Sequence, residues 1–480
     1  MLAATVLGSG MALLDTTVVN VALPHIGTDL DAGVGGLQWT VNGYLLTLSA
    51  LILLGGALGD LMGRRRIFVV GTVAFAAASV LCGLAPSVET LVVARMLQGA
   101  GGALLTPGSL AVVSATFAPA DRGRAIGAWS GLMGIFGASG PFVGGWLIEA
   151  LSWRWVFFLN VPVAVAVVLV ARRWVPESRG ADDGTTAADD GGRPARAGVV
   201  QRLRRLDVVG AVLAAAALGL VSAALVAAPD RGATDPLVVG TGLGGLLATA
   251  GFVLAERRVA HPMVPPDLFS SAAFLVANAV TFVMYAALGG VAFVLVLTLQ
   301  VVMGYGALEA GAALLPVSVL MLLLSPSVGG LTTRTGPRLP MTAGPLLAGT
   351  GIALAASLGA DAAYWTDVVP RIAVFGLGMS LTVAPLTTTA MAAAPDRYAG
   401  IASGVNTAVA RAAGLLAVAA LPLLVGLAGD AYRDPGVLLP AYRTAMLGCA
   451  AMLALGGLLA LLGLPGRTPA AAPEPPVAPG

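Results

Sequence analysis

The stretch Gly56-Ala-Leu-Gly-Asp60-Leu-Met-Gly63-Arg64-Arg65-Arg66 follows a long apolar run and ends in three consecutive arginines. A weaker copy stands 273 positions later, as Gly329-Gly-Leu-Thr-Thr-Arg334-Thr-Gly336-Pro-Arg338. A second pair of charged loops, Asp121-Arg122 and Asp396-Arg397, is separated by 275 positions. Two pairs of loops at nearly one offset predict two halves arranged as parallel repeats, each built from six membrane spans.

The regions between these loops are apolar enough to need lipid as their solvent. The 480 residues are 58% hydrophobic and 10% charged, with a mean hydropathy of +0.91, whereas a soluble domain carries about 25% charged residues. Apolar runs of the length that a helix needs to cross a hydrocarbon core of about 30 Å recur along the chain. Segments such as 213–228 are apolar on every face, while a barrel strand would alternate. We therefore expect an all-α polytopic membrane protein.

Fourteen runs of this kind are long enough to span the bilayer. We predict six in each half and two between the halves, near residues 2–24, 37–58, 67–86, 90–113, 125–148, 156–173, 206–228, 237–256, 272–302, 310–331, 340–360, 368–393, 401–427 and 441–464. The predicted divisions are an N-terminal six-span half (1–173), a disordered cytoplasmic loop (174–205), two extra spans (206–256), a cytoplasmic connector (257–271), a C-terminal six-span half (272–467) and a disordered tail (468–480).

The positions of the arginines predict the orientation. The loops after even-numbered spans hold 19 arginines, and the other loops hold 3. Because cytoplasmic loops retain positive charge, both termini are predicted to face the cytoplasm. The first span lacks a basic leader and a small-residue cleavage site, so we expect it to be retained rather than removed as a signal peptide.

The chemistry-bearing residues exclude several classes of protein. All 26 basic residues are arginine, whereas a Walker-type phosphate loop and a pyridoxal enzyme each need a lysine. Cys82 and Cys449 stand singly in apolar runs, and His25 and His261 are far apart, which indicates neither a disulfide framework nor a metal centre. The chain has no polar set typical of a membrane enzyme, and a structural or receptor role would not explain the loop repeat. We expect a carrier, not an enzyme, without cofactor, metal or nucleic-acid partner.

Short motifs on the predicted spans resemble those of one known family. The loop 56–66 is similar to the loop signature of the major facilitator superfamily, with Leu61 where an arginine is common. Ala94-Arg95-Met-Leu-Gln98-Gly99-Ala-Gly101 resembles the fourth-span arginine motif of that superfamily. Gly140-Pro141-Phe-Val-Gly144-Gly145 resembles its fifth-span antiporter motif, with Phe136 in place of the usual glycine.

Two further segments are similar to motifs of the fourteen-span drug:proton antiporter branch, the EmrB/QacA type. They are Leu14-Asp15-Thr-Thr-Val-Val-Asn20-Val-Ala-Leu-Pro24 and Trp153-Arg154-Trp155-Val-Phe-Phe-Leu-Asn160-Val-Pro162. The resemblance implies a major facilitator fold with two extra central spans. It also implies proton-coupled secondary active efflux of small amphipathic or aromatic compounds by alternating access. The implied setting is a bacterial cell membrane, in which a monomer uses the proton gradient as its energy source.

Asp15 is the candidate proton-coupling residue because it lies well inside the first predicted span. A charged aspartate there costs about 2.5 to 3.5 kcal/mol on insertion scales, so it is retained mainly where it lines an interior path. Such a carboxyl can bind and release a proton as its surroundings change, and family analogy implies Arg95 as its partner. The alternative is a structural role in which Thr16, Thr17 or Asn20 holds the carboxyl by hydrogen bonds.

The direction of transport has two interpretations. The fifth-span motif and Asp15 favour export. The alternative is an importer or uniporter of the same fold, because the fold alone does not decide the direction.

By resemblance, the charged loop after the second span belongs to a cytoplasmic gate. The expected gate residues are Gly56, Asp60, Gly63, Arg64, Arg65, Asp121 and Arg122. Asp60 would lie at the negative end of its helix, where it needs nearby cations. The alternative is that these are solvated loop charges that only orient the chain.

The fifth-span motif consists of Gly140, Pro141, Gly144 and Gly145. Glycines four residues apart let helices approach closely in lipid, so one interpretation is packing. The other is that Pro141 bends a helix that must flex during alternation.

Mixed aromatic and amide faces are the candidates for a cargo cavity. The predicted set is Asn20, Trp39, Asn42, Gln98, Asn278, Phe282, Tyr285 and Asn406. Asn278, Phe282 and Tyr285 share one face of the ninth span. Any of these side chains could instead be an ordinary core or lipid-facing residue. Arg411 resembles a thirteenth-span arginine of the family, and its role could be structural.

Overall fold

The computed structural model of the chain describes residues 2–116, 119–178, 207–259, 262–394, 399–464 and 466, and every regular element within them is a helix. The N-terminal helices are α1 (Leu2–Asp29), α2 (Val34–Met62), α3 (Arg64–Gly83), α4 (Val88–Thr116), α5 (Pro119–Ala150), α6 (Trp155–Phe158) and α7 (Asn160–Trp174). Two long helices follow, α9 (Val208–Arg231) and α10 (Pro236–Arg258). The C-terminal helices are η1 (Pro266–Ser270), α11 (Ala272–Val301), α12 (Ala307–Ala312), α13 (Leu315–Thr335), α14 (Arg338–Ala355), η2 (Tyr364–Val368), α15 (Val369–Ala392), α16 (Ala399–Val425), η4 (Ala431–Arg433) and α17 (Pro435–Gly463).

Twelve segments of the described residues are long and apolar enough to cross a membrane. They are Leu2–Asp29, Val34–Met62, Arg64–Gly83, Val88–Pro107, Trp155–Trp174, Val208–Arg231, Pro236–Arg258, Ala272–Val301, Ala307–Leu324, Tyr364–Ala392, Ile401–Val425 and Pro435–Gly463. The two remaining predicted spans, 125–148 and 340–360, fall on α5 and α14, which are not among the twelve. The expectation of an all-α polytopic membrane protein is confirmed, while the total of fourteen spans stays a prediction.

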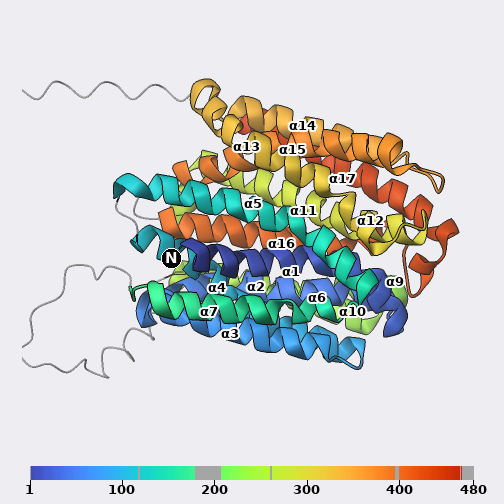
Figure 1. Cartoon of the computed structure of the whole chain (residues 1–480), viewed down its shortest axis with the longest axis horizontal. Coiled ribbons are helices and arrows are strands. Elements are labelled where there is room, and N and C mark those ends of the chain that lie inside the picture. The colour runs from blue at the N-terminus through green and yellow to red at the C-terminus, as the bar shows by residue number, and fades with distance from the viewer. Residues whose placement is uncertain are drawn as a thin grey trace, which may run out of the picture.

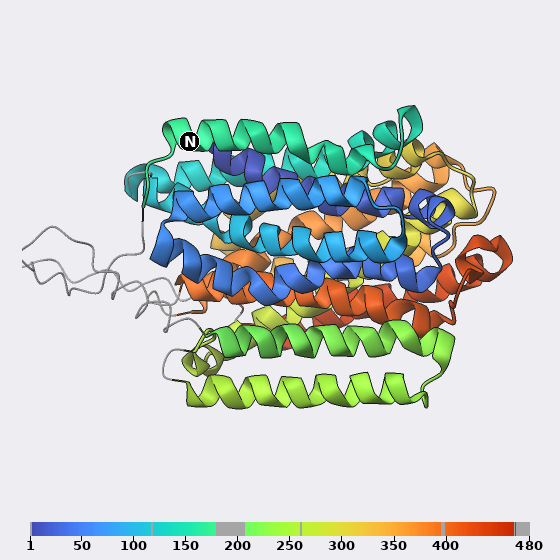
Figure 2. The ribbon, with the colours of Figure 1, turned by 90° about the horizontal axis from the view of Figure 1, so that it is seen from below.

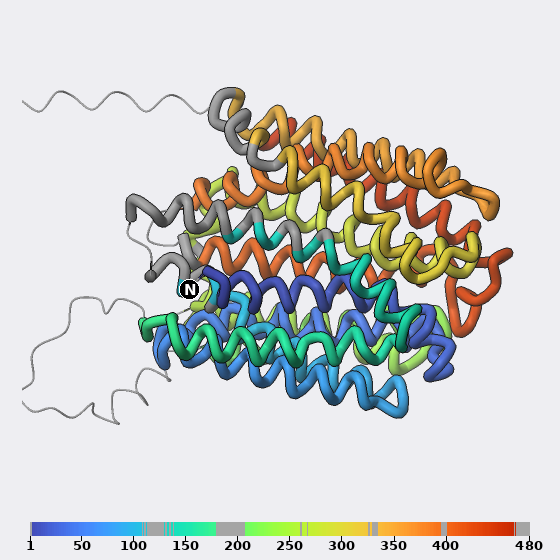
Figure 3. The backbone as a smooth tube through the Cα atoms, viewed as in Figure 1, coloured from blue at the N-terminus to red at the C-terminus, as the bar shows by residue number. Residues whose placement is uncertain are grey.

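The long helices run side by side along the long axis of the molecule (Figure 1). α1 begins at the end marked N and reaches the opposite end, which we call the far end (Figure 3). α9 and α10 form a hairpin at one edge of the bundle, as Figure 2 shows from below. α9 contacts both α2 and α16. The hairpin therefore attaches where the N-terminal and C-terminal helices meet.

An aspartate caps the N-terminus of three of the long helices. Asp207 Oδ1 accepts a hydrogen bond from the backbone nitrogen of Gly210 at 2.6 Å, at the start of α9. Asp235 and Asp434 cap α10 and α17 in the same way, and each is followed by a proline at the first helical position. Both features satisfy the free backbone donors of a helix N-terminus.

A close contact between glycine and phenylalanine occurs in each group of helices. A Cβ on Gly101 of α4 would lie 2.6 Å from the backbone nitrogen of Phe75 in α3. In the C-terminal helices the roles are exchanged, because a Cβ on Gly351 of α14 would meet the backbone nitrogen of Phe375 in α15. Such approach suits lipid, where hydrophobic burial does not drive helix association. The two contacts are separated by nearly the same offset as the charged loops.

Some predictions fall outside the described residues. They concern the side chains of Asp121 and Arg122 at the start of α5, the segment Asp396-Arg397, His261, most of the loop 174–205 and the tail 468–480. These predictions remain untested, as do the predicted domain boundaries.

Candidate functional site

Asp15 lies in the middle of α1, where this helix packs against α4, α5 and α7. Its relative exposure is 1%. A carboxylate so far from water is stable only when an opposite charge and hydrogen-bond donors match it. α4 and α7 supply both.

Arg95 of α4 provides the opposite charge. Its Nη1 lies 2.5 Å from Asp15 Oδ2, and neither side chain is more than 1% exposed. Nε of the same guanidinium donates to the carbonyl oxygen of Thr40 in α2 at 3.0 Å. The guanidinium carbon lies 4.5 Å from the ring centroid of Tyr44 and 5.8 Å from that of Phe157, at cation–π distance. Arg95 therefore joins α1 to α2 and is fully enclosed.

Two amides complete the surroundings of Asp15. The side-chain nitrogens of Gln98 and Asn160 donate to Asp15 Oδ1 at 2.7 and 3.0 Å. Both amides also donate to Oγ of Ser79 in α3, at 2.7 and 2.8 Å. Gln98 Oε1 accepts from Arg95 Nη1 at 2.6 Å. We call Asp15, Ser79, Arg95, Gln98 and Asn160 the Asp15 network.

The hydrogen-bond partners proposed from the sequence for a structural Asp15 bind elsewhere. Thr16 and Thr17 donate to backbone carbonyls of their own helix, and Asn20 donates to the carbonyl oxygen of Thr16. That part of the structural hypothesis is wrong, because the carboxyl is held by other helices.

The sequence reasoning anticipated only part of the Asp15 network. Gln98 was predicted to line the cargo cavity, and its amide is instead used by Asp15 and Ser79. Asn160 belongs to a quoted motif but was not predicted as a site residue, and Ser79 carries no signal in the sequence. Asn160 could have been found from its place in that motif.

The polar residues of α11 and α16 bind one another. The amide nitrogen of Asn406 donates to Asn278 Oδ1 at 3.2 Å and to Thr281 Oγ1 at 2.8 Å. Asn278 is 8% exposed, Tyr285 is half-buried and Phe282 is 39% exposed. The three residues predicted to share one face of α11 therefore do not share one environment.

On α2, Asn42 is buried, and neither atom of its amide has a hydrogen-bond partner in the described part of the chain. Trp39 is half-buried. One turn before Asn42, Gln38 donates to the carbonyl oxygens of Val418 and Ala419 in α16, at 2.6 and 2.9 Å. The bonds of Gln38 cross the junction between the N-terminal and C-terminal helices. The amide of Asn42, one turn away, remains able to bind another polar group.

The described gate residues form a cluster at the end where the N-terminus lies. Arg64 Nε and Asp60 Oδ1 are 2.8 Å apart at the α2–α3 junction. Arg65 donates from its backbone nitrogen to Oε1 of Glu177 at 3.0 Å, and Glu177, beyond α7, was not predicted. Gly63 has a φ of +111°, and a Cβ there would lie 2.6 Å from the same carboxylate oxygen, so the position requires glycine.

The glycine motif of α5 lies between two helices. Gly140 and Gly144 face α1, where a Cβ on Gly144 would lie 2.6 Å from Cγ1 of Val18. Gly145 faces α12, where its Cβ would lie 2.5 Å from Cα of Leu308. The motif therefore packs α5 against an N-terminal and a C-terminal helix at once.

Two other motif residues differ in how closely they are packed. Pro141 lies inside α5, and its carbonyl oxygen occupies the place that a Cβ on Gly311 would take. A Cβ on Gly56 of α2 would be in ordinary contact with Pro107 of α4, at 3.6 Å.

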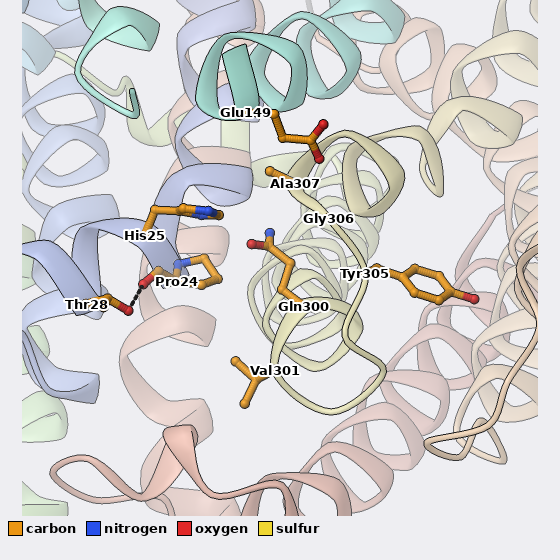
Figure 4. Close-up of a pocket in the computed structure, with 9 residues that line it drawn as sticks. All are labelled: Pro24, His25, Thr28, Glu149, Gln300, Val301, Tyr305, Gly306 and Ala307. Carbon is orange, nitrogen blue, oxygen red and sulfur yellow. Dashed lines mark hydrogen bonds between the residues drawn. The ribbon is translucent and has the colours of Figure 1, made fainter. Parts of the chain in front are cut away.

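A cavity of about 320 Å³ lies near the far end. It is lined by Pro24, His25, Thr28, Glu149, Gln300, Val301, Tyr305, Gly306 and Ala307 (Figure 4). The side chains of His25 and Gln300 face each other across it. Glu149 Oε1 accepts from the backbone nitrogen of Leu308 at 2.9 Å. Since α1 and α5 form one wall and the C-terminal helices the other, the cavity changes shape whenever these groups of helices move apart.

Hydrogen bonds close the far end between the two groups of helices. Tyr432 donates from its hydroxyl to the carbonyl oxygen of Ala32 at 3.0 Å. Arg433 donates to the carbonyl oxygen of Gly27 at 2.8 Å and to Asp31 Oδ1 at 3.2 Å. We call these contacts, together with those of Gly429 below, the end seal.

Gly429 links three parts of the chain at this end. Its carbonyl oxygen accepts from the backbone nitrogen of Val34 at 2.8 Å, and its own nitrogen donates to Asp230 Oδ1 at 2.8 Å. Asp230 lies in the last turn of α9. The end seal therefore includes the extra hairpin as well as α2 and the α16–α17 loop.

This bundle is the fold of a polytopic membrane carrier, with a buried charge pair at the centre of its N-terminal helices. The sequence model of the Major Facilitator Superfamily matches residues 5–418. The chain belongs to this superfamily.

Three curated relatives are similar over most of their length. The Tetracenomycin C resistance and export protein of Streptomyces glaucescens is 34% identical over 90% of this chain and 77% of its own. The multidrug resistance protein Stp of Mycobacterium tuberculosis is 34% identical over 85% and 72%. The puromycin resistance protein pur8 of Streptomyces alboniger is 35% identical over 86% and 78%.

Solved structures share the fold at low sequence identity. A bacterial homologue of the human lysosomal transporter Spinster, inward-facing and unoccupied, has a TM-score of 0.63 at 18% identity, covering 96% of both chains. The peptide transporter POT in complex with sulfate has a TM-score of 0.67 at 14% identity, covering 96% of this chain and 93% of its own.

Proposed function

We propose that the protein is a proton-coupled exporter of small amphipathic or aromatic compounds, working by alternating access. The observation that carries this proposal is the Asp15–Arg95 pair, buried in the centre of a bundle whose relatives are resistance and export proteins. No cofactor is required, because the proton gradient supplies the free energy. The cargo is a small molecule, and the acting unit is a monomer.

Protonation of Asp15 would act through its partners. A neutral carboxyl no longer balances Arg95, and a buried charge that loses its partner is strongly destabilising. Arg95 is also bonded to α2, and the two amides are bonded to α3. One proton would therefore change the relative free energies of different helix arrangements, which is what coupling to alternating access requires.

The positions of the arginines support an assignment of the two ends of the bundle to the two sides of the membrane. We assign the end with the N-terminus to the cytoplasm, because Arg64, Arg65 and Arg66, Arg172 and Arg173, and Arg257 and Arg258 stand at the helix ends there. The end seal would then close the outward side, and the cluster of Asp60, Arg64 and Arg65 would be the cytoplasmic gate. α5 and α14 pack along helices that meet the criteria for a span, so we propose that both also cross the membrane, for a total of fourteen.

The test is transport into inverted vesicles of a bacterial membrane with an acidic lumen. The wild-type protein is expected to accumulate rhodamine 123 and to stop when a protonophore collapses the gradient. Asp15→Asn is expected to abolish gradient-driven accumulation while the protein still inserts. Asp29→Asn is the matched control on the same helix, since Asp29 pairs with Arg154 away from the Asp15 network. Accumulation by Asp15→Asn at the wild-type rate, or without any gradient, would contradict the proposal.

A further inference from the structure

Arg411 is an arginine in the middle of a predicted span that the mechanism above does not use. It is residue 13 of the 27 in α16. α2 and α16 run antiparallel, because Val34 bonds to Gly429 at the far end and Leu53 packs on Gly404 nearer the other end. Arg411 therefore lies near the middle of the membrane, where a charged side chain is rare and marks an internal path.

The level of Arg411 along the bundle follows from the helix register. Gln38 of α2 bonds to the carbonyl oxygen of Val418 in α16. Tyr44 lies six residues further along α2, and Arg411 lies seven residues before Val418. At 1.5 Å per residue, Tyr44 and Arg411 both lie about 10 Å from this bond toward the end with the N-terminus, at nearly the same level.

Two tyrosines lie near the level of Arg411. Tyr44 of α2 is at this level, and the carbonyl oxygen of Tyr285 in α11 lies beside Gly414, one turn after Arg411. Gly289, one turn after Tyr285, packs on Gly414, one turn after Arg411, so the two helices touch at this level. Arg411 therefore faces the junction between the N-terminal and C-terminal helices.

Arg411 also lies at the level of the Asp15 network without belonging to it. The ring face of Tyr44 is stacked on Arg95, which is already paired with Asp15. Within the described part of the chain, Arg411 makes no hydrogen bond or ion pair, and its side chain is partly exposed. By comparison, Arg371 is paired with Asp367. The described residues thus leave one positive charge at mid-membrane without a carboxylate.

We propose that Arg411 binds an acidic group of the cargo, a carboxylate or phenolate, while Tyr44 and Tyr285 flank its aromatic body. A planar guanidinium binds such oxygens through two parallel hydrogen bonds, which favours arginine at this position. The inference rests on the proposed function and adds aromatic anions to the cargo that the protein carries. In this proposal only the ring of Tyr44 separates the cargo from the Asp15–Arg95 pair. The cargo then lies at the junction between the N-terminal and C-terminal helices, which opens during alternation.

The experiment compares two probes with the same xanthene ring system, the anion fluorescein and the cation rhodamine 123. Both are measured in proteoliposomes of phosphatidylcholine, which has no net charge, so that anionic lipid cannot occupy Arg411. The wild type is expected to transport fluorescein. Arg411→Gln is expected to slow fluorescein transport by roughly tenfold or more and to leave rhodamine 123 within about twofold. Arg411→Lys, which keeps the charge, is expected to retain part of the fluorescein transport.

Arg443→Gln is the matched control, because Arg443 is an exposed arginine on α17. Equal losses of both probes in Arg411→Gln, or no loss of either, would overturn the inference. So would a wild type that transports rhodamine 123 under a proton gradient and ignores fluorescein, a result that leaves the proposed function intact. Failure of the wild type to transport either probe under a gradient would instead count against the proposed function as well.

Discussion

Three donors converge on the carboxylate of Asp15, and each of them is bonded elsewhere. Arg95 also bonds to α2, and Gln98 and Asn160 also bond to Ser79. The network therefore lies on α1, α3, α4 and α7 and is bonded to α2. A hydrogen bond to a charged group contributes about 1.5 to 3 kcal/mol. A change of charge on Asp15 therefore alters the strength of the bonds that connect all five helices.

Asn160→Ala tests the Asp15 network while both residues of the Asp15–Arg95 pair stay in place. The substitution removes a donor to Asp15 and one to Ser79, so we expect the free energy of unfolding to fall by about 1.5 to 3 kcal/mol and transport to slow. Thr72→Ala is the control, since the buried Thr72 hydroxyl bonds, among the residues that the structure describes, only to the backbone of its own helix, at Phe68. Thermal unfolding in detergent, with transport in parallel, measures both. Equal effects of the two substitutions would show that Asn160 has only a general packing role.

The sequence identified Asp15 because a lone carboxylate in an apolar run is unusual. It could not identify how that carboxylate is satisfied. Ser79 resembles any small helix residue, and Gln98 was assigned to cargo as one of the residues of mixed aromatic and amide faces. Partners from α3, α4 and α7 become visible only when these helices are placed around α1.

α5 contacts both the N-terminal and the C-terminal helices through one motif, Gly140 to Gly145. Its glycines face α1 on one side and α12 on the other, at distances that leave no room for a methyl group. A helix held in this way can transmit movement between the two groups only while both contacts stay tight.

Gly144→Ala tests this tight packing. The added methyl group would lie 2.6 Å from Val18 Cγ1, and such overpacking costs about 1 to 3 kcal/mol. We expect a lower melting temperature in detergent and slower transport. Gly137→Ala on the same helix is the control, because its nearest neighbour, Leu13 Cδ2, would be at 3.4 Å, an ordinary contact. If Gly137→Ala and Gly144→Ala behave alike, the close approach of α5 to α1 has no special role.

The helices themselves were largely predictable, because runs of about 20 apolar residues have one common structure in lipid. Their internal breaks were not. The predicted span 156–173 covers α6 and α7, and Asn160, the first residue of α7, donates to Asp15. Leu159, between the two helices, keeps helical backbone angles, with φ −53° and ψ −32°.

The whole molecule is closed at the far end by bonds between its N-terminal and C-terminal helices. Arg433 and Tyr432 bond to the α1–α2 turn, and Gln300 of α11 donates to the carbonyl oxygen of Val21 at 3.0 Å. Gln300 also lines the cavity of Figure 4. Opening the far end must therefore break the end seal and expose this cavity.

Arg433→Ala is expected to favour the open far end. The readout is labelling of Ala307→Cys, a buried residue of the cavity wall, by a membrane-impermeant thiol reagent, with Cys82 and Cys449 replaced by serine. Because Arg433 is partly exposed, the loss of its two bonds is worth about 1.4 kcal/mol, and we expect labelling to accelerate by about tenfold. Arg231→Ala, at the exposed end of α9, is the control. An unchanged labelling rate in Arg433→Ala would mean that the end seal does not hold this end closed.

The repeated charged loops predicted two groups of helices, and the exchanged glycine–phenylalanine contacts agree with that repeat. The far-end contacts could not be predicted in the same way. Most of them end on backbone carbonyls, those of Gly27, Ala32 and Gly429, which every residue type provides. The attachment of the extra hairpin through Asp230 likewise depends on where a loop far along the chain comes to lie.

Infrared difference spectroscopy of the carboxyl band of Asp15 tests whether one buried acid changes its protonation during transport. Spectra of the reconstituted wild type, with and without cargo, are compared with those of Asp15→Asn to isolate this one side chain. We predict that a protonated-carboxyl signal appears or disappears when cargo binds and is missing in Asp15→Asn. A carboxyl that stays ionised, or stays protonated, in every step of transport would contradict the mechanism proposed here.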